Sequence, residues 1–229
     1  MKLQWPALGI GVSVLVLSGT LSAGIIGTTG DVVVLDPPPA DVRQDVFESN
    51  DHIYVWKEVE GLRLNGGKSV KLNASAPGYY NEMSDLSDSV ITGDNVWVTS
   101  YFIHADYVGS PPPGTAGTWL SGSITFEEDI LGLIVVDVDI PLSHALLGAP
   151  GTTYGGGSKC GLELDTKPMW DRFTLSADMK TIDIEQFWVS TVRDTVRVVA
   201  FHPGPEPGTF LLVVAGGAGL LARRRRRTR

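Results

Sequence analysis

Cysteine is nearly absent from this chain of 229 residues, which contains only Cys160. One cysteine cannot form an intramolecular disulfide, so the fold must depend on the burial of apolar side chains. We expect Cys160 to be a small buried or half-buried residue of a strand. A disulfide with a second chain, or a role as a nucleophile, stays open as an alternative.

Motifs for catalysis and zinc binding are lacking too. The histidines show neither the HExxH nor the HxH spacing of zinc sites; they are His52, His104, His144 and His202. No GxSxG segment occurs, and the glycines that precede Ser158 have no strand, turn and helix around them. The sequence therefore predicts a protein that is not an enzyme and has no cofactor.

Basic residues are scarce between the two ends of the chain. Without Lys2, the six arginines of the C-terminal end and Glu206, 11 basic and 25 acidic residues remain, a net charge near −14. Such a surface repels nucleic-acid phosphate and anionic lipid. We therefore expect no nucleic-acid partner.

The C-terminal 25 residues have three parts in a fixed order. Pro205, Glu206 and Pro207 are followed by an apolar run of 14 residues, 209–222. Five consecutive arginines come next: Arg223, Arg224, Arg225, Arg226 and Arg227. A helix of that run is about 21 Å long, against a hydrocarbon core of about 30 Å. We expect a short transmembrane helix that holds weakly in the membrane, with the arginines on the cytoplasmic side.

This order of Pro-Glu-Pro, short apolar helix and arginine cluster resembles the PEP-CTERM sorting domain of Gram-negative bacteria that make exopolysaccharide. The resemblance covers about 25 of the 229 residues. It implies that an exosortase, a membrane cysteine transpeptidase, reads and cuts the tail, and that the protein ends at the cell surface or in the extracellular matrix. An ordinary tail anchor is the alternative.

The N-terminal end is consistent with export. A basic start at Lys2 precedes an apolar stretch, 7–17, and then small residues. This is the pattern of a signal peptide, and we expect the export translocon to recognise it. Cleavage is predicted between Ala23 and Gly24, or one residue to either side. An uncleaved N-terminal anchor is the alternative.

The region between these ends is patterned as β-structure. Residues 95–107 alternate, with Val98, Phe102 and His104 on one face and Trp97, Tyr101 and Ile103 on the other, which predicts a central strand between two layers. Further strands are predicted at 31–35, 52–57, 69–73, 119–126, 130–138, 173–176, 181–189 and 195–201. One helical turn is expected near 141–147. The fold class is all-β, an antiparallel β-sandwich of jelly-roll outline.

Four blocks of this region are similar to ectodomains that accompany PEP-CTERM tails. They are residues 49–58, 91–106, 122–132 and 172–182. The resemblance implies a shared fold and location, and it supplies no chemistry.

Three local groups could bind a ligand. His104 and Asp106 face the same way on a strand and could share a cation. Asp137 with Asp139, or the acids 127–129, offer the oxygen ligands that calcium accepts. Trp97 and Trp119 could stack on sugar rings, although aromatic residues also dominate sandwich cores.

These observations predict a signal peptide at 1–23, a β-sandwich domain at 24–202, a proline-rich spacer with the sorting motif at 203–208, a transmembrane helix at 209–222 and an arginine cluster at 223–229. We expect an exported protein, tethered to the inner membrane before processing, that acts as a structural or interaction module associated with exopolysaccharide. The alternatives are a carbohydrate-binding module, with or without calcium, and an extracellular hydrolase.

Overall fold

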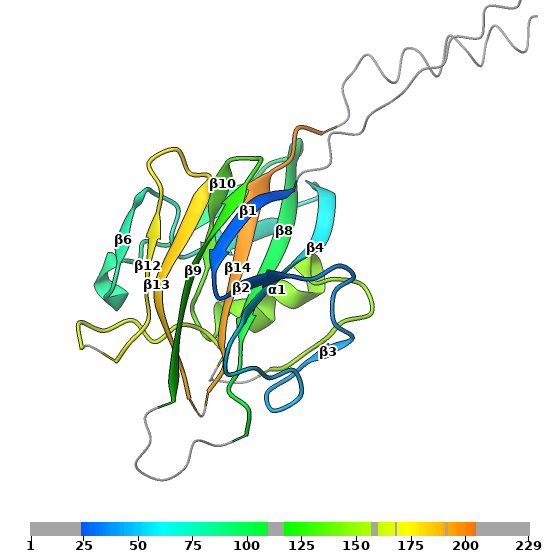
Figure 1. The fold of residues 1–229 in the computed structure, drawn as a ribbon. Helices are drawn as coiled ribbons and strands as arrows, with labels where there is room; N and C mark the ends of the chain where they lie inside the picture. Colours follow the sequence, from blue (N-terminus) through cyan, green and yellow to red (C-terminus); the bar gives the residue numbers. More distant parts are fainter. Residues whose placement is uncertain (1–23, 110–116, 157–159, 168, 191, 205–229) are drawn as a thin grey trace, which may run out of the picture.

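The computed structural model describes residues 24–109, 117–156, 160–167, 169–190 and 192–204 (Figure 1). Gly24 is its first residue. Ala23 and the predicted signal peptide lie outside the described residues, as do Pro205–Pro207, the apolar run and the arginine cluster. Strands dominate the described part of the chain, which confirms the all-β expectation. None of the helices in these ranges is long and apolar enough to cross a membrane.

The first sheet has five antiparallel strands. In spatial order they are β1 (Ile25–Gly30), β9 (Thr118–Phe126), β13 (Thr181–Val189), β12 (Arg172–Leu175) and β6 (Gly78–Tyr80). The strands predicted at 173–176 and 181–189 are confirmed as β12 and β13, which pair with each other as a hairpin. Ser176 fixes its turn, because the Ser176 hydroxyl oxygen accepts hydrogen bonds from the backbone N–H groups of Lys180 and Thr181.

The second sheet also has five strands, and one pair in it is parallel. In spatial order they are β10 (Ile130–Ile134), β14 (Asp194–Phe201), β8 (Val96–Ala105), β4 (Ile53–Leu64) and β2 (Val32–Val34). β2 runs parallel to β4, while the other pairs are antiparallel. A fully antiparallel arrangement was therefore the wrong expectation for β2.

Smaller elements cover the outer face of the second sheet. They are β3 (Asp41–Val42) paired in parallel with β11 (Thr153–Tyr154), β5 (Ser69–Leu72) paired with β7 (Ser89–Thr92), and the helix α1 (Asp139–Leu147). A 3₁₀ turn, η1 (Met83–Asp85), follows β6. Figure 1 shows α1 and β3 on the side of the second sheet that faces away from β9, β12 and β13.

Two hydrophobic cores result from this layering. The first lies between the two sheets, where Phe126 and Phe187 of the first sheet meet Tyr101 and Val198 of the second. The second core lies between the second sheet and the outer elements, and it contains Trp56, Phe102 and Leu147 among others. Both faces of β8 are therefore buried, which confirms that this strand is central.

The segment predicted as a strand over 130–138 divides at Ile134. Beyond it, the N–H groups of Val135 and Val136 donate to the side-chain oxygen of Asn73 instead of to a neighbouring strand. The helix α1 then begins at Asp139 and is longer than the single turn expected at 141–147. Pro141 is tolerated because the N–H groups of the first turn have no partner within a helix.

Both ends of the described domain meet the same turn. The Glu127 N–H donates to the carbonyl of Gly24 at 2.9 Å, and the Phe201 N–H donates to the carbonyl of Asp129 at 2.9 Å. Trp119 lies at the other end of β9, seven residues before Phe126, which corresponds to roughly 23 Å along a strand. The domain thus has one end where the chain enters and leaves, and an opposite end near Trp119.

Candidate functional site

An exposed pair of tryptophans lies at the end of the domain opposite to the chain termini. Trp119 of β9 is directly opposite Trp188 of β13 in the strand register. Their ring centroids are 5.0 Å apart with an interplanar angle of 47°. The side chain of Trp119 is 57% exposed, and that of Trp188 is half-buried. A large apolar group left in water at this level is a candidate contact surface.

The pair faces solvent because of strand alternation and one β-bulge. On β9, Leu120 and Ile124 enter the core between the sheets, so Trp119 points the other way. On β13, Ile184 and Phe187 both face that core, since a register shift lies between them. The shift reverses the alternation and turns Trp188 outward.

Polar side chains continue this outer face along β9 and its neighbours. The Ser123 hydroxyl lies 2.7 Å from that of Thr29, and the Thr125 hydroxyl lies 3.1 Å from that of Thr181. Asp183 is opposite Ser123 and is exposed. We call the surface formed by Trp119, Trp188, Ser121, Ser123 and Asp183 the tryptophan face. Aromatic planes beside hydroxyl and carboxylate groups offer stacking and hydrogen bonding to a sugar ring.

Trp97, the other tryptophan proposed from the sequence, lies elsewhere. It is half-buried near the start of β8, and its carbonyl accepts the N–H of His202 at 2.9 Å. The guanidinium of Arg63 lies 5.9 Å from the centre of its ring, and Gly204 packs against the indole. Trp97 is thus at the end where the chain leaves, and the structure does not bring it together with Trp119.

A fully buried ion pair occupies the second core. Arg197 and Glu58 have no exposed side-chain surface, and two N–H groups of Arg197 donate to the Glu58 oxygens at 2.6 and 2.7 Å. Glu58 also accepts from the hydroxyls of Ser100 and Tyr154, at 2.7 and 2.5 Å. Arg197 further donates to the Ser143 hydroxyl and the Ile140 carbonyl. Every group of the pair is satisfied, so it serves as structure within the core.

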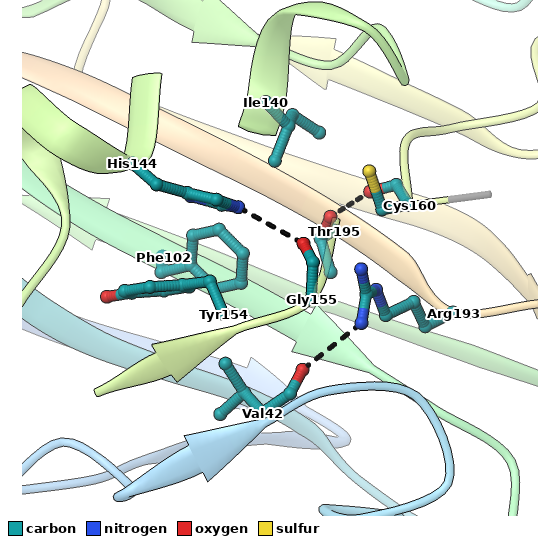
Figure 2. Close-up of a pocket in the computed structure, with 9 residues that line it drawn as sticks. All are labelled: Val42, Phe102, Ile140, His144, Tyr154, Gly155, Cys160, Arg193 and Thr195. Atoms are coloured by element: carbon teal, nitrogen blue, oxygen red, sulfur yellow. Dashed lines mark hydrogen bonds between the residues drawn. The ribbon is translucent and has the colours of Figure 1, made fainter. Parts of the chain in front are cut away.

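A narrow recess with no room for a water molecule lies beside this pair, and its lining includes both His144 and Cys160 (Figure 2). Burial, followed by the charge of Arg197, lowers the pKa of His144 to about 4, so its ring is neutral. Its Nδ1 accepts from Arg197 at 3.1 Å, and its Nε2 lies 3.4 Å from the Gly155 carbonyl. The Cys160 thiol donates to the Asp137 carbonyl at 3.4 Å. Both ring nitrogens of His144 and the thiol of Cys160 therefore have hydrogen-bond partners within the protein.

Cys160 is buried, as expected, but it lies between strands and not within one. Its N–H and that of Gly161 donate to the Asp137 carboxylate, and the Thr195 hydroxyl donates to its carbonyl. The cysteine therefore anchors its loop to the end of β10 and the start of β14.

The structure does not form the metal sites proposed from the sequence, and it groups Asp106 with Asp45 and Glu48 instead of with His104. His104 is fully buried, with its Nε2 2.9 Å from the Phe47 carbonyl, and it belongs to no group of three metal-ligating residues within the described ranges. Asp139 forms an ion pair with Lys71 at 2.9 Å. Asp129 lies 3.7 Å from the ammonium of Lys180. Neither the 137–139 acids nor the 127–129 acids form a cluster of three in this part of the chain.

Comparison with protein-family models, with curated proteins and with solved structures finds no match to this chain.

Proposed function

We propose that this chain is an exported protein, sorted by a PEP-CTERM tail, that acts in the cell envelope or extracellular matrix as a structural or interaction module associated with exopolysaccharide. The observation that carries this proposal is the sequence of the tail, in which Pro205–Pro207, an apolar run and arginines follow one another in that order. The last described strand, β14, ends at Phe201, four residues before Pro205. A β-sandwich of jelly-roll outline is the finer fold that we include in the proposal.

The arrangement of the domain suits this tethering. Since Gly24 and Phe201 both contact the turn at 127–129, a membrane tether beyond Gly204 leaves the opposite end free to face outward. The tryptophan pair of that face, Trp119 and Trp188, is at that outward end. A module that binds matrix components needs its contact surface there.

The start of the domain supports cleavage after Ala23. Burial raises the pKa of the Glu128 carboxyl, while hydrogen bonding from the Gly24 N–H acts in the other direction. One oxygen of Glu128 is buried with no hydrogen-bond partner among the described residues. Cleavage before Gly24 would turn its N–H into an ammonium group beside this carboxylate, which favours the ionised form.

Cell fractionation tests the proposal. We compare the wild-type chain with a triple variant, Pro205→Ala, Glu206→Ala and Pro207→Ala, and measure the intact mass of each product. We expect the wild type at the surface or in the medium, with both ends removed, and the variant retained in the inner membrane with its tail. Wild-type protein in the cytosol with both ends intact would refute export.

A second candidate function is carbohydrate binding, which the tryptophan face favours. We expect the purified full-length chain to be retained on the cell's own exopolysaccharide. Trp119→Ala and Trp188→Ala should each lower retention about tenfold, since loss of stacking on one ring costs of the order of 1 kcal/mol or more. Trp97→Ala is the matched control, because Trp97 lies at the other end of the domain. Equal retention of all three variants would contradict this candidate.

A further inference from the structure

Three carboxylates converge near the outward end of the domain, outside the sites described so far. Glu163 and Asp171 belong to the segment between β11 and β12, and Asp194 is the first residue of β14. One oxygen of each lies within 4.8 Å of the others. Asp171 and Asp194 have no exposed surface, and Glu163 is half-buried. Like charges this close repel strongly unless something neutralises them.

No hydrogen-bond donor among the described residues compensates the buried carboxylate of Asp194. Neither of its carboxylate oxygens has a hydrogen-bond partner among the residues that the structure describes. Burial raises its pKa well above the ordinary value, and the carboxylates of Asp171 and Glu163 raise it further. A fully buried carboxylate without donors is costly, and native proteins pair such groups or use them to coordinate metals.

Asp171 is held in a fixed orientation beside it. Its two oxygens accept the N–H groups of Glu163 and Trp188, each at 2.7 Å. Each oxygen retains a second lone pair that can reach a cation. Two backbone donors are too few to compensate for this burial, which raises the pKa of Asp171 to about 8.

We propose that Glu163, Asp171 and Asp194 bind a divalent cation, and that this cation is calcium. All three ligands are carboxylates, with neither nitrogen nor sulfur, which favours a hard cation over zinc or copper. Calcium fits better than magnesium because it accepts irregular sets of oxygen ligands, whereas magnesium requires near-octahedral geometry. The ion supplies the positive charge that Asp194 lacks.

A second acidic group, Asp45, Glu48 and Asp106, provides a useful contrast. The Asp45 N–H donates to Asp106 at 3.0 Å, and Glu48 accepts from the Gly109 N–H at 2.9 Å. Asp45 is exposed, so water can solvate it. This group lacks the buried, unpartnered oxygen of Asp194, and we assign no ion to it.

The bound ion would connect three segments that are separated in the sequence. It links the segment 163–171 to β14, and through the hydrogen bond of Asp171 to Trp188 it also supports the end of β13. The tryptophan face would therefore be anchored by the ion. The inference itself does not depend on export or on sugar binding, because it concerns only the buried carboxylates.

Calcium titration of the purified full-length chain, stripped with a chelator, tests the proposal. We expect one calcium per chain by calorimetry. At a calcium concentration about 100 times Kd, we expect a rise in Tm of roughly 5–10 °C. Terbium takes the same kind of oxygen ligands, and it should show luminescence sensitised by Trp188, whose backbone N–H donates to Asp171.

Asp194→Asn removes the essential charge and should abolish both the Tm rise and the terbium signal. Glu185→Gln is the matched control, since Glu185 is an exposed carboxylate of β13 outside the group. Asp194→Asn can also fold well without the ion, because it removes a buried charge. The proposal is overturned if calcium leaves the wild-type Tm unchanged at millimolar concentration. It is also overturned if Asp194→Asn responds to calcium as the wild type does.

Discussion

Replacement of Arg197 by methionine isolates the energetic role of the buried ion pair. The change removes two hydrogen bonds of 2.6 and 2.7 Å and leaves the Glu58 carboxylate fully buried. Glu58 keeps only the hydroxyl donors of Ser100 and Tyr154. Loss of one partner from a buried ion pair costs about 3–5 kcal/mol. This is a large part of the ~5–15 kcal/mol that stabilises an ordinary domain.

A double-mutant cycle separates the charge from the packing. Glu58→Gln alone leaves the guanidinium buried without its counter-ion, so it should destabilise by a similar amount. The double variant Glu58→Gln with Arg197→Met buries no charge, and the amide oxygen of the glutamine still accepts from Tyr154. We therefore expect the double variant to be more stable than either single variant, which requires a coupling energy larger than the cost of either single change, that is, above about 3–5 kcal/mol.

Denaturant-induced unfolding at pH 7, followed by tryptophan fluorescence, measures these free energies. Arg43→Met is a suitable control because the Arg43–Asp41 ion pair is at the surface, and it should change little. The reasoning fails if Arg197→Met costs less than about 1 kcal/mol. It also fails if the effects of the two single changes simply add within about 0.5 kcal/mol.

Two further changes test other parts of the fold. Burial lowers the pKa of His104 to about 4, below its ordinary 6.5, so the neutral ring contributes stability above pH 6.5 that is lost as the pH falls toward 4. Between pH 7 and pH 4.5, unfolding measurements should show the wild type losing about 2–3 kcal/mol more than His104→Gln; equal losses would contradict the buried neutral ring. In Gly155→Ala, the new methyl group would meet the buried guanidinium of Arg193 at 2.1 Å, so a loss of about 1–3 kcal/mol is expected in the same assay. Gly156→Ala, with no atom within 4 Å of the added carbon, should be nearly neutral.

The strand pattern was predictable where alternation is regular. Both faces of β8 carry apolar side chains in the sequence, and both are buried in the structure. The β12–β13 hairpin also follows directly from two β-rich segments around a short polar turn. Such local patterns need no knowledge of distant residues, which is why they suffice here.

The regular alternation of inward and outward side chains fails at β13. As a result, the sequence predicted Trp119 as a contact residue but did not predict Trp188. Strict period-two spacing from Ile182 and Ile184 would place Trp188 inside the core. The bulge between Ile184 and Phe187 reverses this order and exposes the indole. A bulge depends on pairing with β9, so residues 181–189 alone do not reveal it.

The buried charges depend on partners far away in the sequence. Arg197 alternates with the core residues Val196 and Val198, so it would ordinarily face solvent. It is buried because Glu58, 139 residues earlier, neutralises it. The acidic group of Glu163, Asp171 and Asp194 is equally non-local, whereas Asp137 and Asp139, proposed from adjacent positions, have other partners.

The acidic group and the buried ion pair both involve β14, because successive side chains of this strand face opposite sides of the second sheet. Val196 and Val198 enter the core between the sheets, and Asp194 has the same parity at the end of that core. Thr195 and Arg197 face the other way, toward α1 and the pocket of Figure 2. The carboxylate group and the ion pair therefore lie on opposite sides of one strand. Since the two groups lie on opposite sides of the strand, we expect removal of the proposed calcium to leave the Glu58–Arg197 coupling unchanged.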